Sequence, residues 1–184
     1  MRCLIVALFW LSALMLVACN APIAAREIEE VQSTPVTPGP LPQTPPDSCP
    51  ITQPQNPIFV PPEPYAPTAP YEQFWYGANG LWTALQPDGR WYALPHDEHG
   101  YSQKVFWWRE GYDMTKEQQP LITISGRRLD GDAPTFEHTG GTSGHHDDMG
   151  QFMLTGVAIP TAGCWEITGR YNDQSLSFVV WVSQ

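Results

Sequence analysis

The fold is decided by a C-terminal stretch of two apolar segments, GCWEITGRY (residues 163–171) and SLSFVVWV (residues 175–182), separated by Asn-Asp-Gln. In the second segment four apolar residues recur at every other position: Leu176, Phe178, Val180 and Val182. This period of two is typical of a strand with one buried face, and Ser175, Ser177 and Ser183 on the alternate positions indicate that the other face is exposed. We therefore predict an antiparallel hairpin whose apolar row faces a core, with Trp181 on the outer face.

The same strand-favouring composition extends back to Tyr71. Aromatic and β-branched residues are frequent there, and no window shows a sustained helical period. Five further strands are expected over residues 81–85, 90–94, 104–109, from Pro120 onward, and 151–159. The turn at Pro87-Asp88-Gly89 predicts that the first two form a hairpin. Seven short strands in about 110 residues indicate an all-β, antiparallel, immunoglobulin-like β-sandwich over residues 71–184.

Residues 19–70 have a different composition. Fourteen of the chain's 20 prolines lie between Pro35 and Pro70. Proline cannot donate to a strand ladder, and the tract has few large apolar side chains with which to build a core. We expect an extended, polyproline-like linker here that acts as a spacer, although its last part, residues 50–70, could run across the domain surface.

The first 19 residues predict export and lipid attachment. Arg2 precedes an apolar run over residues 4–14 that is too short to span a membrane but has the length of a signal peptide. The run ends in Leu16-Val17-Ala18-Cys19, which matches the bacterial lipobox. We expect cleavage of a signal peptide (residues 1–18), diacylglyceryl attachment to Cys19, and membrane anchoring at the cell surface or periplasmic face. The alternative is an ordinary secretory signal with a chance cysteine.

The charge of the mature chain limits its partners. Removal of residues 1–18 leaves 8 basic and 19 acidic side chains, a formal charge of −11. Nucleic-acid binding needs lysine and arginine to displace counterions from phosphates, so no nucleic-acid partner is expected. The expected partners are the membrane, through the lipid, and an envelope glycan or protein; no cofactor is expected.

Two of the four cysteines are left after processing. Cys3 is removed with the signal peptide, Cys19 carries lipid, and Cys49 and Cys164 reach a compartment in which disulfides form. One bridge between them is the favoured arrangement. Two unpaired thiols are the alternative.

The C-terminal segments resemble an uncharacterised family of exported bacterial proteins, many of them lipoproteins. The segment Gly163-Cys164-Trp165-Glu166 is the most specific part, and Cys49-Pro50-Ile51-Thr52, Gly80-Leu81-Trp82 and residues 126–130 resemble other landmarks of the family. The likeness spans residues 49–184 and implies the fold, the exported location and the Cys49–Cys164 bridge. It implies no chemistry, because the family has no assigned activity. The segment from His138 to Asp148 departs from the family pattern.

Two kinds of binding residue are candidates. Aromatic side chains could form an exposed platform for sugar rings or a partner: Trp75, Tyr76, Trp91, Trp107, Trp108 and Trp181. Histidines and acids in two Gly-rich loops are weaker candidates for a Zn or Cu site: His96 and His99 in one, His145, His146 and Asp147 in the other. Core packing and solvated loops are the plainer interpretations of each set.

Catalytic motifs are not found in the sequence. There is no Gly-Xaa-Ser-Xaa-Gly elbow, no Ser-Xaa-Xaa-Lys and no nucleotide-binding loop. We therefore predict a noncatalytic, lipid-anchored β-sandwich that binds a ligand or takes part in envelope interaction. A metal-binding extracytoplasmic domain is the alternative, and an unrecognised hydrolase is the third hypothesis.

Overall fold

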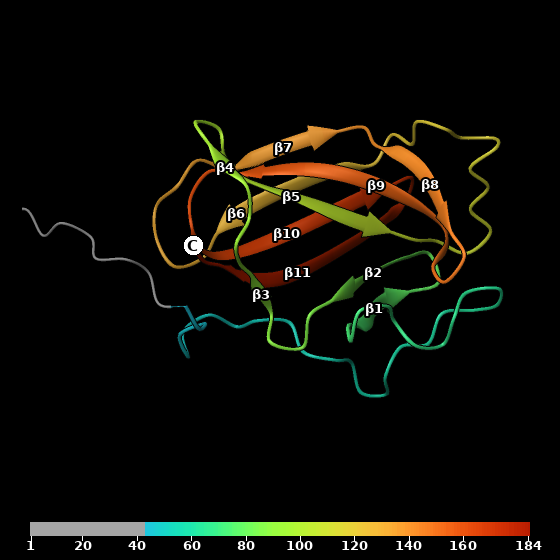
Figure 1. Ribbon diagram of the computed structural model, residues 1–184, viewed down its shortest axis with the longest axis horizontal. Coiled ribbons are helices and arrows are strands. Elements are labelled where there is room, and N and C mark those ends of the chain that lie inside the picture. Colours follow the sequence, from blue (N-terminus) through green and yellow to red (C-terminus); the bar gives the residue numbers. More distant parts are fainter. Residues whose placement is uncertain (1–42) are drawn as a thin grey trace, which may run out of the picture. The chain divides into compact units, whose positions relative to one another are not determined.

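The computed structural model describes residues 43–184, and within them the protein contains strands but no helix (Figure 1). The strands are β1 (Phe74–Ala78), β2 (Leu81–Leu85), β3 (Arg90–Trp91), β4 (His96–Asp97), β5 (Gly100–Trp107), β6 (Thr123–Arg128), β7 (Phe136–Thr139), β8 (Thr142–His146), β9 (Gly150–Ile159), β10 (Gly163–Tyr171) and β11 (Gln174–Val182). The prediction of an all-β protein is confirmed. Residues 43–184 include no helix with the length and apolarity that a membrane crossing needs.

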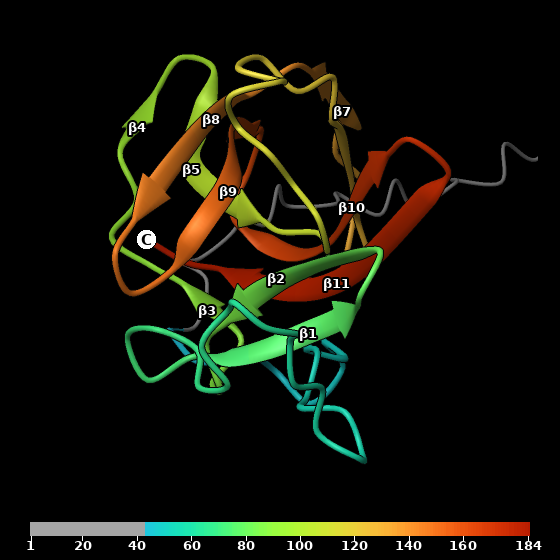
Figure 2. The same cartoon turned by 90° about the vertical axis from the view of Figure 1, so that its right-hand side faces the viewer.

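The strands form three sheets. One has five strands in the order β3-β11-β10-β6-β7, one has four in the order β4-β5-β9-β8, and β1 and β2 form a separate hairpin. All pairings are antiparallel except that of β3 with β11. The predicted C-terminal hairpin is present, with Tyr171 opposite Gln174 at its turn. Figure 2 shows the β1–β2 hairpin lying beside the two larger sheets.

The two larger sheets share one hydrophobic core. Phe178, Val180 and Val182 of β11 are buried in it, as their alternation predicted. The ring of Trp107 from β5 lies 5.8 Å from that of Phe178, so an aromatic contact joins the two sheets. The ring of Trp107 also lies against the main chain of Gly169, where any Cβ would collide with it. Glycine at this position lets the indole fill the space between the sheets.

A second hydrophobic cluster covers part of the opposite face of the four-stranded sheet. Trp108 lies there with Trp75 and Trp82 of the β1–β2 hairpin, together with Tyr65 from the preceding segment. Consecutive strand residues point to opposite faces, so Trp107 and Trp108 can both be buried only because this strand is covered on both sides. The hairpin therefore adds a third layer over one half of the sheet.

The Pro-rich segment differs from the predicted linker. Residues 43–70 belong to the same compact unit as the sheets, and Tyr65 and Ala69 are buried beneath the β1–β2 hairpin. Thr52 exchanges hydrogen bonds with Val179: its N–H donates to the Val179 carbonyl at 3.0 Å, and its Oγ1 accepts from the Val179 N–H at 2.8 Å. The domain boundary predicted at residue 70 thus lies too far along the chain.

The Cys49–Cys164 disulfide is present and joins positions 115 residues apart. The bridge packs with Trp181, Ile51 and Leu129 on the outer face of β10 and β11. Trp181 is consequently 1% exposed. Trp181 does lie on the outer face, as predicted, but it is not exposed to solvent, because the disulfide and the Pro-rich segment cover that face.

Two local predictions are also wrong. Residues 81–94 do not form a hairpin: β2 pairs with β1, and β3 pairs in parallel with β11. The His-rich segments expected to be loops include three short strands, with His96 on β4, His138 on β7 and His145 on β8. Pairing with the adjacent strands β5, β6 and β9 outweighs the weak strand propensity of these glycine- and histidine-containing segments.

Candidate functional site

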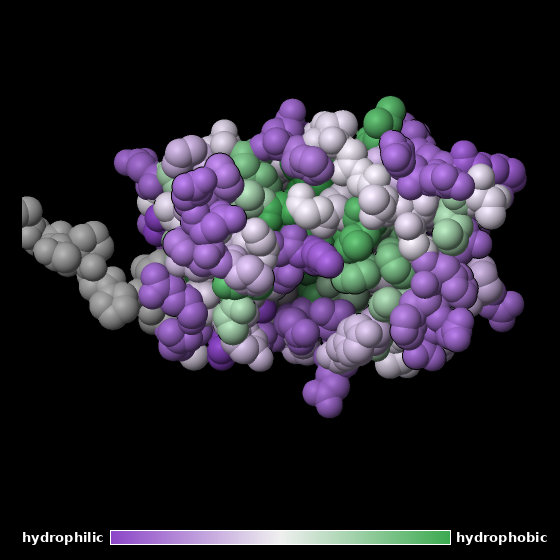
Figure 3. Space-filling model, turned by 45° about the horizontal axis from the view of Figure 1, so that its top comes forward, coloured by the Kyte–Doolittle hydropathy of each residue, from purple (hydrophilic) through white to green (hydrophobic). Residues whose placement is uncertain are grey.

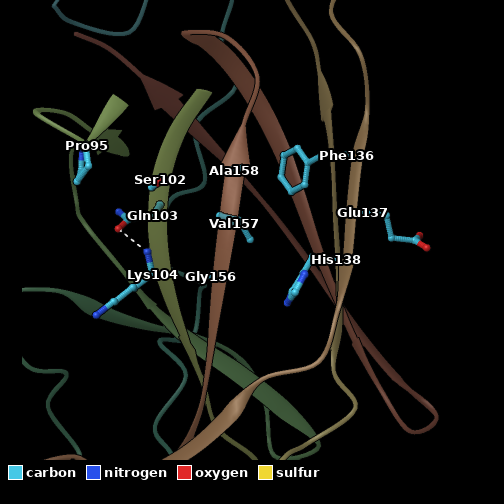
Figure 4. A pocket seen from close by; sticks show the side chains of 10 residues that line it. All are labelled: Pro95, Ser102, Gln103, Lys104, Phe136, Glu137, His138, Gly156, Val157 and Ala158. Atoms are coloured by element: carbon cyan, nitrogen blue, oxygen red, sulfur yellow. Dashed lines mark hydrogen bonds between the residues drawn. The ribbon is translucent and has the colours of Figure 1, made fainter. Parts of the chain in front are cut away.

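An open groove crosses the half of the four-stranded sheet that the β1–β2 hairpin leaves uncovered. We call it the β9 groove; its volume is about 640 Å³ and it is lined by Pro95, Ser102, Gln103, Lys104, Phe136, Glu137, His138, Gly156, Val157 and Ala158 (Figure 4). Strand β9 runs along its middle, with β5 on one side and β7 on the other (Figure 4). Strand β8 pairs with β9 only as far as Leu154, so the rest of β9 is hydrogen-bonded to a strand on one side only, and β7 lies beside it without pairing.

The main chain of β9 is open toward the groove. The N–H of Ser102 donates to the carbonyl of Pro95 at 2.8 Å, so the main chain of Ser102 points away from β9. Main-chain groups alternate in direction along an antiparallel pair, so Ala158, the partner of Ser102, directs its own N–H and C=O away from β5. The N–H of Lys104 also does not reach β9; it donates to Gln103 Oε1 at 2.8 Å. Gly156, the partner of Lys104, therefore also directs its N–H and C=O away from β5.

Four main-chain groups thus line the groove without a strand partner. Within residues 43–184, no main-chain hydrogen bond outside the strand ladders involves Gly156 or Ala158, and neither residue is in register with β8. Both residues are exposed. Open strand edges of this kind are the usual template for pairing with another strand.

Small side chains make the groove possible. A Cβ built on Gly156 would meet no atom within 4 Å, so the space above it is open. Upstream on the same face, Phe152 and Leu154 belong to the aromatic cluster under the hairpin. The change from large to small residues along β9 therefore separates the covered half of the sheet from the groove.

Strand β7 forms the opposite wall. The ring of Phe136 packs 5.8 Å from that of Trp165 and fills the space over Gly126. Phe136 and His138 extend toward β9, whereas the carboxylate of Glu137 points away from the groove (Figure 4). The wall is thus apolar, with one imidazole and no acidic group directed inward.

The charge at the groove differs from that of the chain. The whole sequence carries a formal charge of −10, whereas Lys104 on the β5 side is the groove's one lysine or arginine. In the described part of the chain, no carboxylate lies within 4.0 Å of its ammonium group. Figure 3, with this side of the molecule turned forward, shows apolar residues exposed in a hollow among polar ones.

The predicted aromatic platform is not present. Trp75, Trp91, Trp107, Trp108 and Trp181 are all less than 9% exposed, and Tyr76 is half-buried against the main core. The β1–β2 hairpin, the opposite sheet or the Pro-rich segment covers each of these rings. The tryptophans therefore stabilise the fold and offer no platform to a ligand.

The histidines do not converge. His96, His99, His145, His146 and Asp147 are exposed, and residues 43–184 contain no group of three His, Cys, Asp or Glu side chains placed to hold a metal ion. His96 stacks on Tyr101 at 4.4 Å between ring centroids, and His146 lies 3.8 Å from Asp148. Cys19, the predicted lipid site, lies outside the described residues.

A polar cluster fixes the long connection between β5 and β6. The buried hydroxyl of Tyr171 donates to the carboxylate of Glu117, and the hydroxyl of Tyr112 donates to the Glu117 carbonyl at 2.9 Å. Burial, followed by the hydrogen bond to Glu117, raises the pKa of Tyr171 to about 12. Further along this connection, hydrogen bonds from Thr115 and Lys116 lower the pKa of Asp113 to about 2.

Sequence reasoning did not find the groove. It placed a strand over residues 151–159 but gave no role to Gly156, although an isolated glycine in a strand often marks a close approach of another backbone. His138 was noted only as part of a His-rich segment, and Phe136 was not singled out. These residues come together because β7, which pairs with β6, lies beside the part of β9 that β8 does not cover, and no local pattern reveals this arrangement.

The residues themselves are the only guide to function. Comparison of the chain with models of protein families, with curated proteins and with solved structures finds no match.

Proposed function

We propose that this chain is a lipid-anchored extracytoplasmic protein whose all-β domain binds an extended ligand in the β9 groove and catalyses no reaction. The observation that carries this proposal is the row of unpaired main-chain groups of Gly156 and Ala158 on the floor of an apolar groove. Such a lining can align a ligand by hydrogen bonds and bury its apolar parts at the same time.

The extracytoplasmic location is supported by two features. The sequence Leu16-Val17-Ala18-Cys19 has the order of a lipobox, and the Cys49–Cys164 disulfide is of the kind that persists in oxidising compartments. The lipid is tested by Cys19→Ser, which should move the protein from the membrane to the aqueous fraction while the domain stays folded. Unchanged partition of this variant into detergent would contradict the anchor.

An immunoglobulin-like topology is part of the proposal. With β4, β5, β9 and β8 taken as strands A, B, E and D, and β6, β10 and β11 as C, F and G, the strand orders correspond to the ABED and CFG sheets of immunoglobulin domains. Strand β7 then extends the second sheet beside β6, and β3 adds a parallel strand at its other edge. In this scheme β8, as strand D, is too short to cover all of β9, and the groove occupies the uncovered part.

Ligand binding is tested with the purified disulfide-bonded domain, residues 43–184, on an envelope-glycan array and against a library of linear peptides. We expect a ligand whose binding is lost in Gly156→Leu, because the leucine fills the groove floor. Ala78→Leu is the matched control: Ala78 is also an exposed small strand residue, but it lies outside the groove. Ligands that bind both variants equally would contradict the proposal.

A further inference from the structure

We infer that the ligand of the β9 groove is an extended polypeptide that adds as a strand to the free edge of β9 and carries an acidic residue facing Lys104. The inference rests on the proposed function above and assigns the class of ligand and its orientation.

The free main-chain groups of β9 have the spacing that a paired strand requires. Gly156 and Ala158 each present an N–H and a C=O toward the groove, two residues apart along one strand. A second strand repeats its own donors and acceptors with the same two-residue period, about 6.8 Å. Pairing would continue the ladder that β8 makes with β9 up to Leu154. This is the recognition mode in which main-chain hydrogen bonds give affinity and side-chain sites give specificity.

The two sides of an added strand would meet different surroundings. Alternate side chains of the ligand would point inward, toward Phe136, His138 and Val157, and outward, over Gly156 and Ala158. The inner side is largely apolar, and the outer side is open to solvent beside Lys104. The structure therefore favours a segment in which apolar and polar residues alternate.

The ammonium group of Lys104 is close enough to an added strand to pair with an acidic side chain on it. Lys104 is directly opposite Gly156 in the β5–β9 register, so an added strand lies two strand spacings, roughly 10 Å, from the Lys104 main chain. Gly156 has no side chain to block the way, and the long side chains of lysine and glutamate can meet above it. Lys104 is free of carboxylates within 4.0 Å among the described residues, and Glu137 points away (Figure 4). An acidic ligand residue would supply the missing counter-charge.

The experiment selects linear dodecapeptides from a displayed library on the purified domain and measures their binding to it. Selected peptides should alternate apolar and polar residues and include Asp or Glu. Lys104→Glu should lower the affinity for these peptides about fivefold, which is the size expected for reversing an exposed ion pair. The same variant should favour peptides in which Lys replaces the acidic residue. Methylation of the peptide's alternate amide nitrogens should abolish binding, and hydrogen exchange at Gly156 and Ala158 should slow when the unmethylated peptide binds.

Three results would overturn the inference and separate it from the proposed function. A glycan whose binding depends on Gly156, without slowed exchange at Gly156 or Ala158, would keep the groove as a binding site but exclude strand addition. Slowed exchange in the domain alone at high concentration, with dimer formation, would mean that a second copy occupies the edge. No ligand sensitive to Gly156→Leu would contradict both proposals. Ala158→Pro, which removes one N–H at the edge, provides a second variant if Gly156→Leu fails to fold.

Discussion

Trp107 and Trp108 are adjacent in the chain and both buried, on opposite faces of the same sheet. Trp107 fills the core between the two large sheets, and Trp108 is covered by the β1–β2 hairpin, where its Nε1 donates to the Met149 carbonyl at 2.9 Å. The hairpin covers the sheet only over its aromatic half. The groove begins where the large side chains of this face end, so the third layer determines where a ligand can reach the sheet.

Trp108→Ala should lower the free energy of unfolding by about 3–5 kcal/mol, as loss of a large buried ring usually does. Lys104→Ala is the control on the same face of the sheet, in strand β5, which ends just before Trp108, and it should change stability by less than about 0.5 kcal/mol. Urea unfolding followed by circular dichroism measures both. Similar small effects for the two variants would mean that the hairpin does not pack on this sheet in solution.

Trp181→Ala should cost about as much as Phe178→Ala, again about 3–5 kcal/mol each. The two residues lie on opposite faces of β11, and both are 1% exposed. The core covers Phe178, and the disulfide and Pro-rich segment cover Trp181. Thermal unfolding of the two variants is the measurement. A stable Trp181→Ala protein beside an unstable Phe178→Ala protein would show that the outer cover contributes little.

Removal of the disulfide by the double change Cys49→Ser, Cys164→Ser should lower stability by about 4–5 kcal/mol, the value of the chain-entropy model for a loop of 115 residues. It should also release the segment near residue 49 from β11. Hydrogen exchange at the Thr52 amide, which donates to Val179, reports this release. Unchanged exchange there would show that contacts other than the bridge hold the segment.

Stability should fall between pH 10 and pH 12 because of Tyr171. Its pKa rises from the ordinary 10.0 to about 12 in the folded protein, through burial and the hydrogen bond to Glu117. A raised pKa contributes stability that is fully present below the unfolded value and is lost as the pH approaches the folded value. Tyr171→Phe should flatten this loss in urea unfolding. Burial also raises the pKa of Tyr65 and Tyr112, so part of the slope should persist.

Strong periodicity predicted the strands that form the centre of the fold. The alternating apolar row of β11 faces the core as expected, because the side chains at every second position of a strand point to the same face. The sequence could not predict the partner of β2 or the cover over Trp181. Both depend on contacts with segments that have no regular period. The Pro-rich composition predicts a linker whose residues 50–70 could run across the domain surface, but it does not show that residues 43–70 are part of the compact unit.

The disulfide was predictable and the groove was not. The expected processing of the N-terminus leaves Cys49 and Cys164 with only each other as partners, and they are bridged, whereas the groove depends on register. Ser102 pairs with Ala158 and Lys104 with Gly156, and β8 ends its pairing at Leu154. None of these relationships follows from local composition. The aromatic residues were candidates for a binding surface, but large rings are usually buried in a folded protein. The open surface of the β9 groove is formed by the small residues Gly156 and Ala158.

The most direct test of the central claim is hydrogen exchange at the Gly156 and Ala158 amides, measured by NMR with and without a peptide selected on the domain. We expect fast exchange in the free domain and at least tenfold slower exchange at both amides when the peptide is bound, with no change at Val157, whose main chain already faces β5. Fast exchange at Gly156 and Ala158 in the saturated complex would contradict strand addition at the β9 groove.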